Sequence, residues 1–558
     1  MTKHKSMLII CLLSAIACYG GERRIDRDKQ PAQTRITAAN TKTPDSTISA
    51  VSKPPLAMLD KKNSEPHPIQ PIENNWSALQ PLKQTTNIDF QTKGTKLPQV
   101  FPERYTEIEG VLTFRGNNLR DAPAYGARTI VHKRIEKVWS FRTSSSSWGG
   151  GAGWTGQPAI VRWEAAIQKV MNLKEEFALK KGFVETIYAS LDGNVYFFDL
   201  DSGKESRDPI RIGNPIKGSV SVDARGYPLL YVGEGIPEKK RIGFGLYSLI
   251  DGTRLYYEPG IEEFAYRKWG AFDSSALFNR EADTLVVGGE NGLFYQLKLN
   301  TSFDAGSSSI AIKPQAVKYK YIINGKKGNP YNGIENSVAV YKNLVYFSDN
   351  MGAVQCVDLL AMEPVWALPH TDDTDASLVL DIEEDKPYLY TGTEVDKQGS
   401  KGNAIIRKID GLTGKSVWQL KYPALTIKGD HPVNGGILAT PIKGKGEISD
   451  WMIFTIARYK SLNAGLMVAI DKATGKEVWR WEMPNYAWSS PVDVYDKSGK
   501  SYIIQADSAG NIHLLDGKTG KVLHTIRLGS NIEASPAVYN DKIVVAARGG
   551  IIYCLKIV

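Results

Sequence analysis

Short apolar runs separated by polar turns recur along most of the chain, and one stretch shows this pattern clearly. An apolar run over residues 467–471 ends at Asp471, and a turn at Thr474 and Gly475 leads to a second run that ends at Trp479. An aspartate side chain caps such a turn, and glycine adopts the positive φ that the turn requires. The alternation on either side predicts two half-buried strands joined as a hairpin.

This hairpin is repeated along the chain in a constant register, which predicts a repeat architecture. In most copies an aspartate opens the turn and a glycine closes it, and a tryptophan or another large residue ends the second strand. We expect the aspartates and glycines to shape the turns and the tryptophans to pack in the core. The expected structural residues are Asp199, Gly203, Trp366, Asp410, Gly414, Trp418, Asp471, Gly475, Trp479, Asp516 and Gly520.

Two further strands precede each hairpin, so that one unit holds four antiparallel strands. Repetition of this unit about eight times predicts an all-β, eight-bladed β-propeller of four-stranded antiparallel blades. The last unit ends after its third strand, whereas a strand around Trp139 has no upstream partner. Pairing of residues 135–142 with the last strand would close the ring and remove its exposed edges. In the first blade, residues 164–181 predict one surface helix.

The motif Asp-x-x-Thr-Gly-Lys-x-x-Trp, seen at Asp410–Trp418 and Asp471–Trp479, resembles the pyrroloquinoline-quinone (PQQ) repeat. The resemblance covers residues 135–558 and implies a propeller whose tryptophans pack between blades. Two groups of proteins share this repeat: quinoprotein dehydrogenases, and non-enzymatic propellers such as the outer-membrane assembly lipoprotein BamB. The chain is most similar to the second, non-enzymatic group.

The first hundred residues read as a leader and a tether. Residues 1–17 have a basic start, a short apolar core and small residues at the end, which indicates a signal peptide. Ala15-Ile16-Ala17-Cys18 resembles a bacterial lipobox, which implies lipidation of Cys18 and, with Tyr19 following, an outer-membrane location. Residues 18–100 are poor in apolar residues and predict a disordered tether. Residues 101–134 are expected to form an extension packed on the propeller, which spans 135–558.

Composition and motifs argue against several classes of function. The net charge is +9, but no run of five basic residues occurs, so we expect no nucleic-acid partner. Quinoprotein dehydrogenases hold the quinone against a vicinal Cys-Cys disulfide, and this chain has no such pair. Glu335-Asn336 is one dipeptide, whereas calcium requires six or more converging oxygens. We therefore expect no catalytic residues, no metal, no PQQ and no calcium, and we expect Cys356 and Cys554 to be buried and unpaired.

The turns before the first strands should emerge together on one face and surround the mouth of the central channel. Aromatic side chains beside carboxylates and amides in a concavity suit a polar ligand. The alternative is that polar turns simply line the mouth while the tryptophans fill gaps between blades. The expected mouth residues are Trp148, Trp154, Gln157, Trp269, Asp273, Glu335, Asn336, His431, Asn434, Arg458, Trp488 and Glu533.

These observations favour a monomeric, membrane-anchored binding or scaffold propeller of the bacterial envelope. It would hold a protein partner or an envelope polymer on its loop face, facing the periplasm or the cell surface. A BamB-like role in outer-membrane assembly is one version, implied by the shared repeat and lipobox. A PQQ-dependent dehydrogenase and a sugar-binding propeller are the alternatives.

Overall fold

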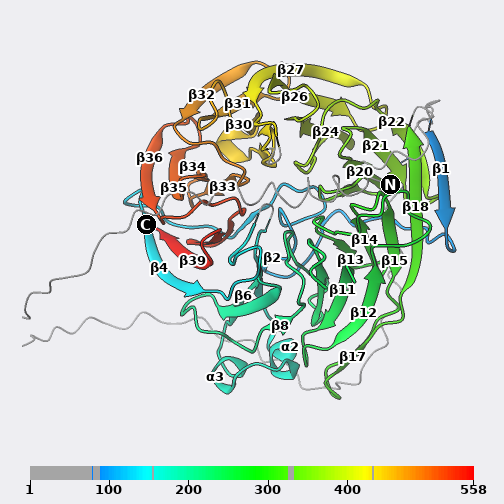
Figure 1. Ribbon diagram of the computed structural model, residues 1–558. Coiled ribbons are helices and arrows are strands. Elements are labelled where there is room, and N and C mark those ends of the chain that lie inside the picture. The colour runs from blue at the N-terminus through cyan, green and yellow to red at the C-terminus, as the bar shows by residue number, and fades with distance from the viewer. Residues whose placement is uncertain (1–77, 80–87, 154–155, 240, 324–331, 430–432) are drawn as a thin grey trace, which may run out of the picture.

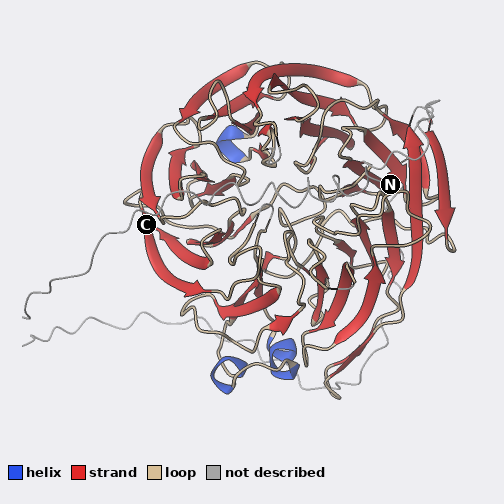
Figure 2. Cartoon of the chain, in the orientation of Figure 1, coloured by secondary structure: helices blue, strands red, loops and turns tan. Residues whose placement is uncertain are grey.

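Eight β-sheets stand around a common centre in the computed structural model, which describes residues 78–79, 88–153, 156–239, 241–323, 332–429 and 433–558 (Figures 1 and 2). The chain is thus an all-β, eight-bladed propeller, as the sequence predicts. The predicted signal peptide, the lipidation of Cys18 and most of the predicted tether lie outside the described residues. No helix in the described part of the chain is long and apolar enough to cross a membrane.

Each blade is a four-stranded antiparallel meander, and several blades carry extra strands. Blade 1 comprises β5 (Ala159–Arg162), β6 (Val184–Ala189), β7 (Asn194–Asp199) and β8 (Ile210–Arg211). Blade 2 comprises β9 (Ser221–Val222), β10 (Leu229–Gly233), β11 (Gly243–Ser248) and β12 (Arg254–Pro259). Blade 3 comprises β13 (Leu277–Asn279), β14 (Thr284–Gly288), β15 (Phe294–Lys298) and β18 (Gln315–Ile323). Blade 4 comprises β19 (Ala339–Tyr341), β20 (Leu344–Ser348), β21 (Val354–Asp358) and β22 (Glu363–Ala367). A hairpin of β16 (Ser302–Asp304) and β17 (Ser309–Ala311) precedes β18.

The second half of the ring is built in the same way. Blade 5 comprises β23 (Val379–Glu383), β24 (Lys386–Gly392), β26 (Lys401–Asp410) and β27 (Ser416–Leu425). Blade 6 comprises β29 (Ile442–Lys443), β30 (Trp451–Ala457), β31 (Gly465–Asp471) and β32 (Glu477–Met483). The short strands β25 (Glu394–Val395) and β28 (Gly435–Gly436) extend blade 6, and a 3-10 turn spans Gly446–Ile448. Blade 7 comprises β33 (Val492–Tyr495), β34 (Ser501–Ala506), β35 (Asn511–Asp516) and β36 (Val522–Arg527).

Blade 8 closes the ring with strands from both ends of the folded region. It comprises β37 (Ala537–Tyr539), β38 (Lys542–Ala547), β39 (Ile551–Ile557) and, as its outer strand, β4 (Ile135–Arg142). β4 pairs antiparallel with β39 from Ile135↔Ile557 to Arg142↔Ile551 (Figure 1). The predicted closure is confirmed, and its physical reason is that it leaves no unpaired edge between the first and last blades.

The core lies between neighbouring blades. One buried apolar cluster spans blades 7, 8 and 1, and others join blades 5 and 6 and blades 6 and 7. Indole N–H groups tie these junctions: Trp366 Nε1 donates to Gly411 O at 2.8 Å, and Trp418 Nε1 donates to Lys472 O at 2.9 Å. Each repeat tryptophan therefore packs against the turn of the next blade. Cys356 and Cys554 are buried and unpaired, as expected.

The repeat aspartates hold the turns between third and fourth strands. Thr474 N and its hydroxyl both donate to Asp471 Oδ1, while Gly475 N donates to Asp471 O at 2.9 Å. The contact from the backbone N–H recurs at Asp410, Asp516 and Asp199, and the contact from the hydroxyl recurs at Asp516 and, with serine in place of threonine, at Asp199. The glycines that close these turns all have positive φ, near 70°. The repeat aspartates and glycines therefore shape the turns, as the sequence pattern predicts.

Two parts of the structure differ from the sequence expectation. Residues 88–100 fall in the predicted tether, but β1 (Ile88–Lys93) pairs with β18 as a fifth strand on blade 3. Main-chain pairing to an open sheet edge needs few apolar side chains, so hydrophobic patterning does not reveal it. The single helix expected over 164–181 is instead α2 (Ala165–Val170) and α3 (Glu175–Ala178), because Met171 is extended at the C-cap of α2.

Candidate functional site

A segment upstream of the propeller enters the middle of the ring and closes it. Between β2 (Gly110–Val111), which pairs with β5, and β3 (Ala124–Tyr125), which pairs with β37, the chain crosses the centre in Figure 1. We call residues 110–125 the plug. Its carbonyl oxygens accept hydrogen bonds from the innermost strands of several blades: Val222 N to Leu112 O, Val340 N to Asn118 O, Leu380 N to Leu119 O and Val538 N to Pro123 O.

Two fully buried arginines anchor the plug. Arg120 donates from Nε to Val338 O at 2.8 Å, from Nη1 to Phe114 O at 2.7 Å and from Nη2 to Ser275 O at 2.9 Å. Arg115 reaches the opposite side of the ring, where it donates to Pro491 O at 2.6 Å and Pro441 O at 3.0 Å. The two guanidinium groups thus bind carbonyl oxygens of blades 3, 4, 6 and 7, so the channel does not run through the molecule.

A series of hydroxyl groups joins successive blades around the axis. The first strand of most blades begins with a serine or threonine whose hydroxyl accepts a hydrogen bond from a backbone N–H of the preceding blade. The links are Gln157 N to Ser219 Oγ, Ser275 N to Ser337 Oγ, Ser337 N to Ser377 Oγ, Ser377 N to Thr440 Oγ1, Thr440 N to Ser490 Oγ and Ser490 N to Ser535 Oγ, at 2.8–3.1 Å. This series explains why serine or threonine recurs at the blade openings.

The residues two positions before these hydroxyls form the lining of a cup on the loop face. Residues two apart in an extended chain point the same way, so these side chains share the axial side. They are Lys217, Asp273, Glu335, Asp375, Leu438, Trp488 and Glu533. The lining is therefore charged over blades 2 to 5 and apolar or aromatic over blades 6 and 7.

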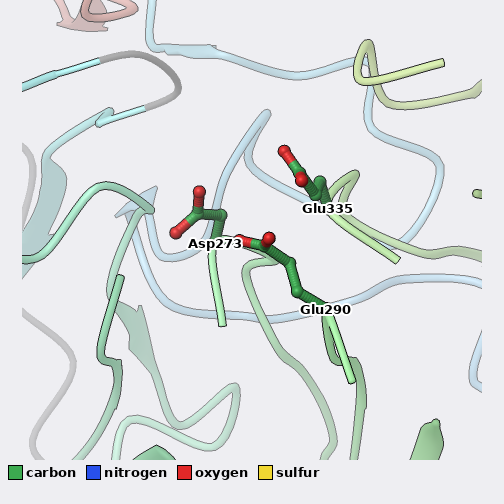
Figure 3. A group of neighbouring side chains, drawn as sticks. All are labelled: Asp273, Glu290 and Glu335. Carbon is green, nitrogen blue, oxygen red and sulfur yellow. The ribbon is translucent and has the colours of Figure 1, made fainter. Parts of the chain in front are cut away.

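Three carboxylates converge in the charged part of the cup. One oxygen each of Asp273, Glu290 and Glu335 lies within 4.8 Å of the others (Figure 3). Asp273 precedes β13, Glu290 follows β14 and Glu335 precedes β19, so two blades supply the group. Lys217 forms an ion pair with Asp273, and Arg267 lies 3.9 Å from Glu290. The cation that this group holds in the structure is thus the protein's own ammonium.

Burial dominates the electrostatics of these acids. Burial raises the pKa of Asp273 to about 6 against the opposing effect of Lys217, and Glu335 adds to the rise. Burial also raises the pKa of Glu290, and the charge of Glu335 raises it further. For Glu335, burial is outweighed by Lys217 and by hydrogen bonds, so its pKa is lowered. Glu335 is therefore the member of the group that ionises most readily.

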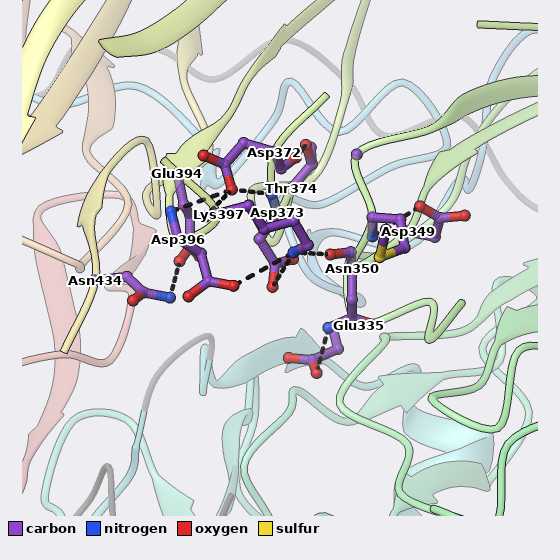
Figure 4. A network of polar contacts seen from close by, with 12 residues as sticks. Glu335, Asp349, Asn350, Asp372, Asp373, Thr374, Glu394, Asp396, Lys397 and Asn434 are labelled. Atoms are coloured by element: carbon purple, nitrogen blue, oxygen red, sulfur yellow. Dashed lines mark hydrogen bonds and ion pairs between the residues drawn. The ribbon is translucent and has the colours of Figure 1, made fainter. Parts of the chain in front are cut away.

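A second acidic group continues the cup across blades 5 and 6. Burial raises the pKa of Asp373, Asp375 and Glu394, and each is raised further by a neighbouring carboxylate. Lys397 lies 3.8 Å from Asp373 and donates to Asn350 O at 2.6 Å (Figure 4). Asn350 Nδ2 in turn donates to Glu335 Oε1 at 2.7 Å, which links the two acidic groups.

Some of the predicted mouth residues lie on the loop face, and others have their polar groups used by the fold. Asp273 and Glu335 line the acidic part of the cup, Trp488 and Glu533 line the remainder, and Asn434 donates to Glu394 Oε2 at 2.9 Å. Trp148 and Trp269 lie half-buried on loops of blades 1 and 3. Trp154 and His431 lie outside the described residues.

Three predicted mouth residues serve the fold. Gln157 Oε1 accepts from Arg115 N of the plug, and its Nε2 donates to Thr113 O. Asn336 is buried and donates to Ser348 O and Thr374 O, which joins blades 4 and 5. Arg458 is buried, donates to Leu462 O at 2.6 Å and lies over the ring of Tyr486. The polar side chains of all three are used within the protein.

The comparisons with known proteins concern mainly the last blades. The family model described as outer membrane protein assembly factor BamB matches residues 463–557. BamB of Kangiella koreensis is 31% identical over 93 residues, or 16% of this chain and 23% of that protein. BamB of Shewanella oneidensis is 33% identical over 84 residues, or 15% and 20%. The match thus spans less than a quarter of either relative. The chain carries a BamB-like PQQ-repeat propeller.

A solved structure extends the likeness in fold to the rest of the ring. A quinohemoprotein alcohol dehydrogenase from Pseudomonas putida HK5 superposes with a TM-score of 0.53 at 12% identity, over 80% of each chain. At this identity the likeness shows the fold alone. The BamB-like propeller described here therefore shares its fold with an enzyme, and fold alone does not decide whether it is one.

Sequence reasoning missed several residues of the cup and the anchors of the plug. Lys217 and Asp375 stand in the same register as Asp273 and Glu335, so the repeat itself held the signal. Glu290 and Glu394 follow second strands, and their turns emerge on the same face as the blade openings. Arg115 and Arg120 lie in the extension before the repeats, where no pattern indicated that the chain would enter the ring.

Proposed function

We propose that this protein is a scaffold of the bacterial envelope that holds a protein partner in its acidic cup and acts in outer-membrane protein assembly. The observation that carries the proposal is that the cup brings buried carboxylates together with the apolar side chains of Leu438 and Trp488. Such a surface suits a partner segment with basic and apolar side chains. The likeness to BamB over residues 463–557 supports the assembly role.

The proposal includes lipid anchoring at Cys18, a monomeric propeller, and a function without catalysis, PQQ or calcium. Anchoring predicts that Cys18→Ser releases the protein from the membrane fraction, measured by fractionation of the envelope. If the protein has no quinone chemistry, it should not reduce a redox dye after PQQ and Ca²⁺ are added. Dye reduction dependent on both additions would support the dehydrogenase alternative instead.

A photo-crosslinking experiment tests the cup as the partner surface. A photoreactive amino acid at Trp269, on the loop face, is expected to capture a discrete protein partner in intact envelopes. The same amino acid at Lys204, whose exposed side chain lies on the opposite face, serves as the control and should capture little. Equal capture from both positions would contradict the assignment of the face.

Neutral amides in the cup provide the matched chemical test. We expect Asp373→Asn, Asp375→Asn and Glu394→Gln together to lower capture from Trp269 about tenfold. Burial raises the pKa of these acids, and a basic partner segment would hold them ionised, whereas amides cannot ionise. The control replaces three exposed acids elsewhere, Glu136→Gln, Glu176→Gln and Asp201→Asn, and removes the same charge. Assembly is then read as the amount of folded outer-membrane protein. Wild-type capture by the cup variant would exclude the cup as the binding surface.

A further inference from the structure

The junction between blades 1 and 2 lacks the tryptophan that closes comparable junctions. At four other junctions, a tryptophan donates a hydrogen bond from Nε1 to a carbonyl oxygen in the next blade. The acceptor is the residue directly after the one that opens the turn of that blade. The tryptophans are Trp139, Trp366, Trp418 and Trp479. In blade 1 the equivalent residue is Arg207, which donates from Nη1 to the equivalent carbonyl, Leu249 O, at 2.7 Å. The guanidinium reproduces the hydrogen bond of the indole but has much less volume.

Arg207 is fixed as a wall of this junction. Its Nε donates to Glu185 Oε1 at 3.0 Å and its Nη2 to Glu185 Oε2 at 2.6 Å, and both side chains are buried. The outer strand of blade 1, β8, has only two residues, so it covers little of the gap. The result is a cavity of about 460 Å³ on the outer side of the ring, between the outer strands of blades 1 and 2.

Three exposed arginines line this cavity: Arg211 from β8, Arg241 before β11 and Arg254 from β12. Within the described part of the chain, none of the three has a carboxylate partner within 4.0 Å. Arg241 and Arg254 lie over the ring of Tyr257, with their guanidinium carbons 4.5 and 5.0 Å from its centroid. The shared ring brings two guanidinium groups to one side of the cavity and orders both of them.

The two acids of the cavity leave an excess of positive charge on its lining. Asp251 Oδ1 accepts hydrogen bonds from Thr253 N and from the Thr253 hydroxyl, at 3.1 and 2.8 Å, so it is engaged in its own turn. Asp208 is exposed at the edge of the cavity. The charges facing the cavity are therefore three guanidinium groups against two carboxylates, one of which is held in its own turn.

We propose that the cavity between blades 1 and 2 is an anion site that binds a phosphate group through Arg211, Arg241 and Arg254. Guanidinium groups bind phosphate oxygens in a bidentate manner, and several from different strands can surround one phosphate. The phosphate belongs either to an envelope lipid headgroup or to a small soluble phosphate. The site lies away from the cup, so it adds a second contact to the proposed scaffold and does not depend on it.

Binding measurements on the full-length protein distinguish the two sources. One arm titrates the protein with inorganic phosphate by calorimetry, and the other measures cosedimentation with vesicles of phosphatidylglycerol and of phosphatidylcholine. Binding only to phosphatidylglycerol vesicles assigns a lipid headgroup, and binding of inorganic phosphate assigns a soluble ligand. We expect Arg211→Gln, Arg241→Gln and Arg254→Gln together to weaken the observed binding about tenfold or more. Binding in neither arm overturns the proposal.

The control variant removes the same charge from exposed arginines elsewhere: Arg104→Gln, Arg134→Gln and Arg527→Gln. It should bind within about twofold of the wild type, whereas equal weakening of both variants would show nonspecific attraction and overturn the site. A thermal melt of each variant checks that it is folded. If the triple variant is unfolded, the single variants Arg241→Gln and Arg254→Gln replace it in the binding measurements. Capture from Trp269 on the loop face should be unchanged, which separates this test from that of the scaffold function.

Discussion

At the scale of single residues, the molecule stabilises buried charge mainly through backbone and neighbouring polar groups. Arg120 and Arg115 are fully buried and have no ion pair with a carboxylate among the described residues, yet carbonyl oxygens accept most of their donors. Burial lowers the pKa of Arg120 to about 9, so the side chain stays protonated at neutral pH. Each arginine thereby donates to carbonyl oxygens of two different blades.

Replacement of Arg120 by methionine should destabilise the propeller strongly. The change leaves the carbonyls of Val338, Phe114 and Ser275 without this donor, and a buried unpaired carbonyl costs about 1–3 kcal/mol. We expect the free energy of unfolding to fall by roughly 3 kcal/mol or more, measured by urea denaturation. Arg104→Met, at an exposed side chain, should change it by less than about 0.5 kcal/mol. Equal midpoints for the two variants would contradict the anchoring role.

The cup acids predict that the protein becomes more stable as the pH falls from 7.5 to 5.5. The folded pKa of Asp273, about 6, exceeds its usual value of 3.8, so the folded state binds protons more readily in this range and stability rises on acidification. Burial raises the pKa of Asp349 to about 6 as well. Asp121, with a pKa of about 2, destabilises the fold only at lower pH, when it is protonated.

The measurement is the midpoint of thermal unfolding as a function of pH. Asp273→Asn should reduce the rise between pH 7.5 and 5.5, because the amide does not titrate. Asp304→Asn, at a fully exposed carboxyl, is the control and should leave the slope unchanged in that range. A midpoint that falls steadily from pH 7.5 to 5.5 in the wild type would refute the assignment of buried protonated acids.

At the scale of elements, the turn glycine of one blade and the tryptophan of the preceding blade require each other. Gly414 has a φ of 71°, and a Cβ atom there would lie 2.8 Å from Trp366 Cδ2. Gly203, Gly475 and Gly520 stand in the same relation to Trp139, Trp418 and Trp479. The glycine is therefore needed both for its backbone conformation and for the close approach of the indole. This coupling explains why the two residues recur together in the repeat.

Substitution of Gly414 by alanine separates these two effects when it is compared with Gly399. Both glycines have positive φ, but a Cβ at Gly399 would meet nothing within 4 Å. Gly399→Ala should cost about 1–2 kcal/mol through backbone strain alone. Gly414→Ala should cost about 2 kcal/mol more, because the methyl group displaces Trp366. Urea denaturation measures both, and equal losses would show that contact with the indole is unimportant.

At the scale of the whole molecule, the ring is closed twice. β4 joins the first and last blades on the outside, and the plug joins blades 2, 4, 5 and 8 from the inside through their backbone N–H groups. The segment that leads into the propeller is thus part of the fold. Because the plug occupies the centre of the ring, we expect an axial ligand to bind from the loop face, where the cup lies.

Hydrogen exchange should report this internal closure. The amides of Val222, Val340, Leu380 and Val538 donate to plug carbonyls and should exchange slowly in the wild type. Arg115→Ala with Arg120→Ala should increase their exchange rates about tenfold or more, because the plug loses its anchors. Ile503, in a strand paired only within blade 7, is the internal control and should change little. Uniform acceleration throughout the ring would indicate global destabilisation instead.

The sequence by itself determined the local structure and the order of the blades. The Asp-x-x-Thr-Gly turns, the alternating strands and the unpaired strand around Trp139 depend on contacts within about ten residues or on repetition, and both can be read along the chain. The mouth residues Asp273, Glu335, Trp488 and Glu533 were identified because every blade opening emerges on one face. Lys217 and Asp375 stand in the same register of the repeat, whereas Glu290 and Glu394 follow second strands and join the cup through the tertiary structure.

Only the tertiary structure decided which polar residues are free and which are used by the fold. Gln157, Asn336 and Arg458 look like ligand groups in the sequence, but their hydrogen bonds go to the plug, to a neighbouring blade and to a loop carbonyl. Arg115 and Arg120 lie in an extension without a repeat pattern, yet they fill the centre of the ring. Hydrogen-bond partners far apart in the chain are set by how the blades close, and the spacing of residues along one strand carries no record of them.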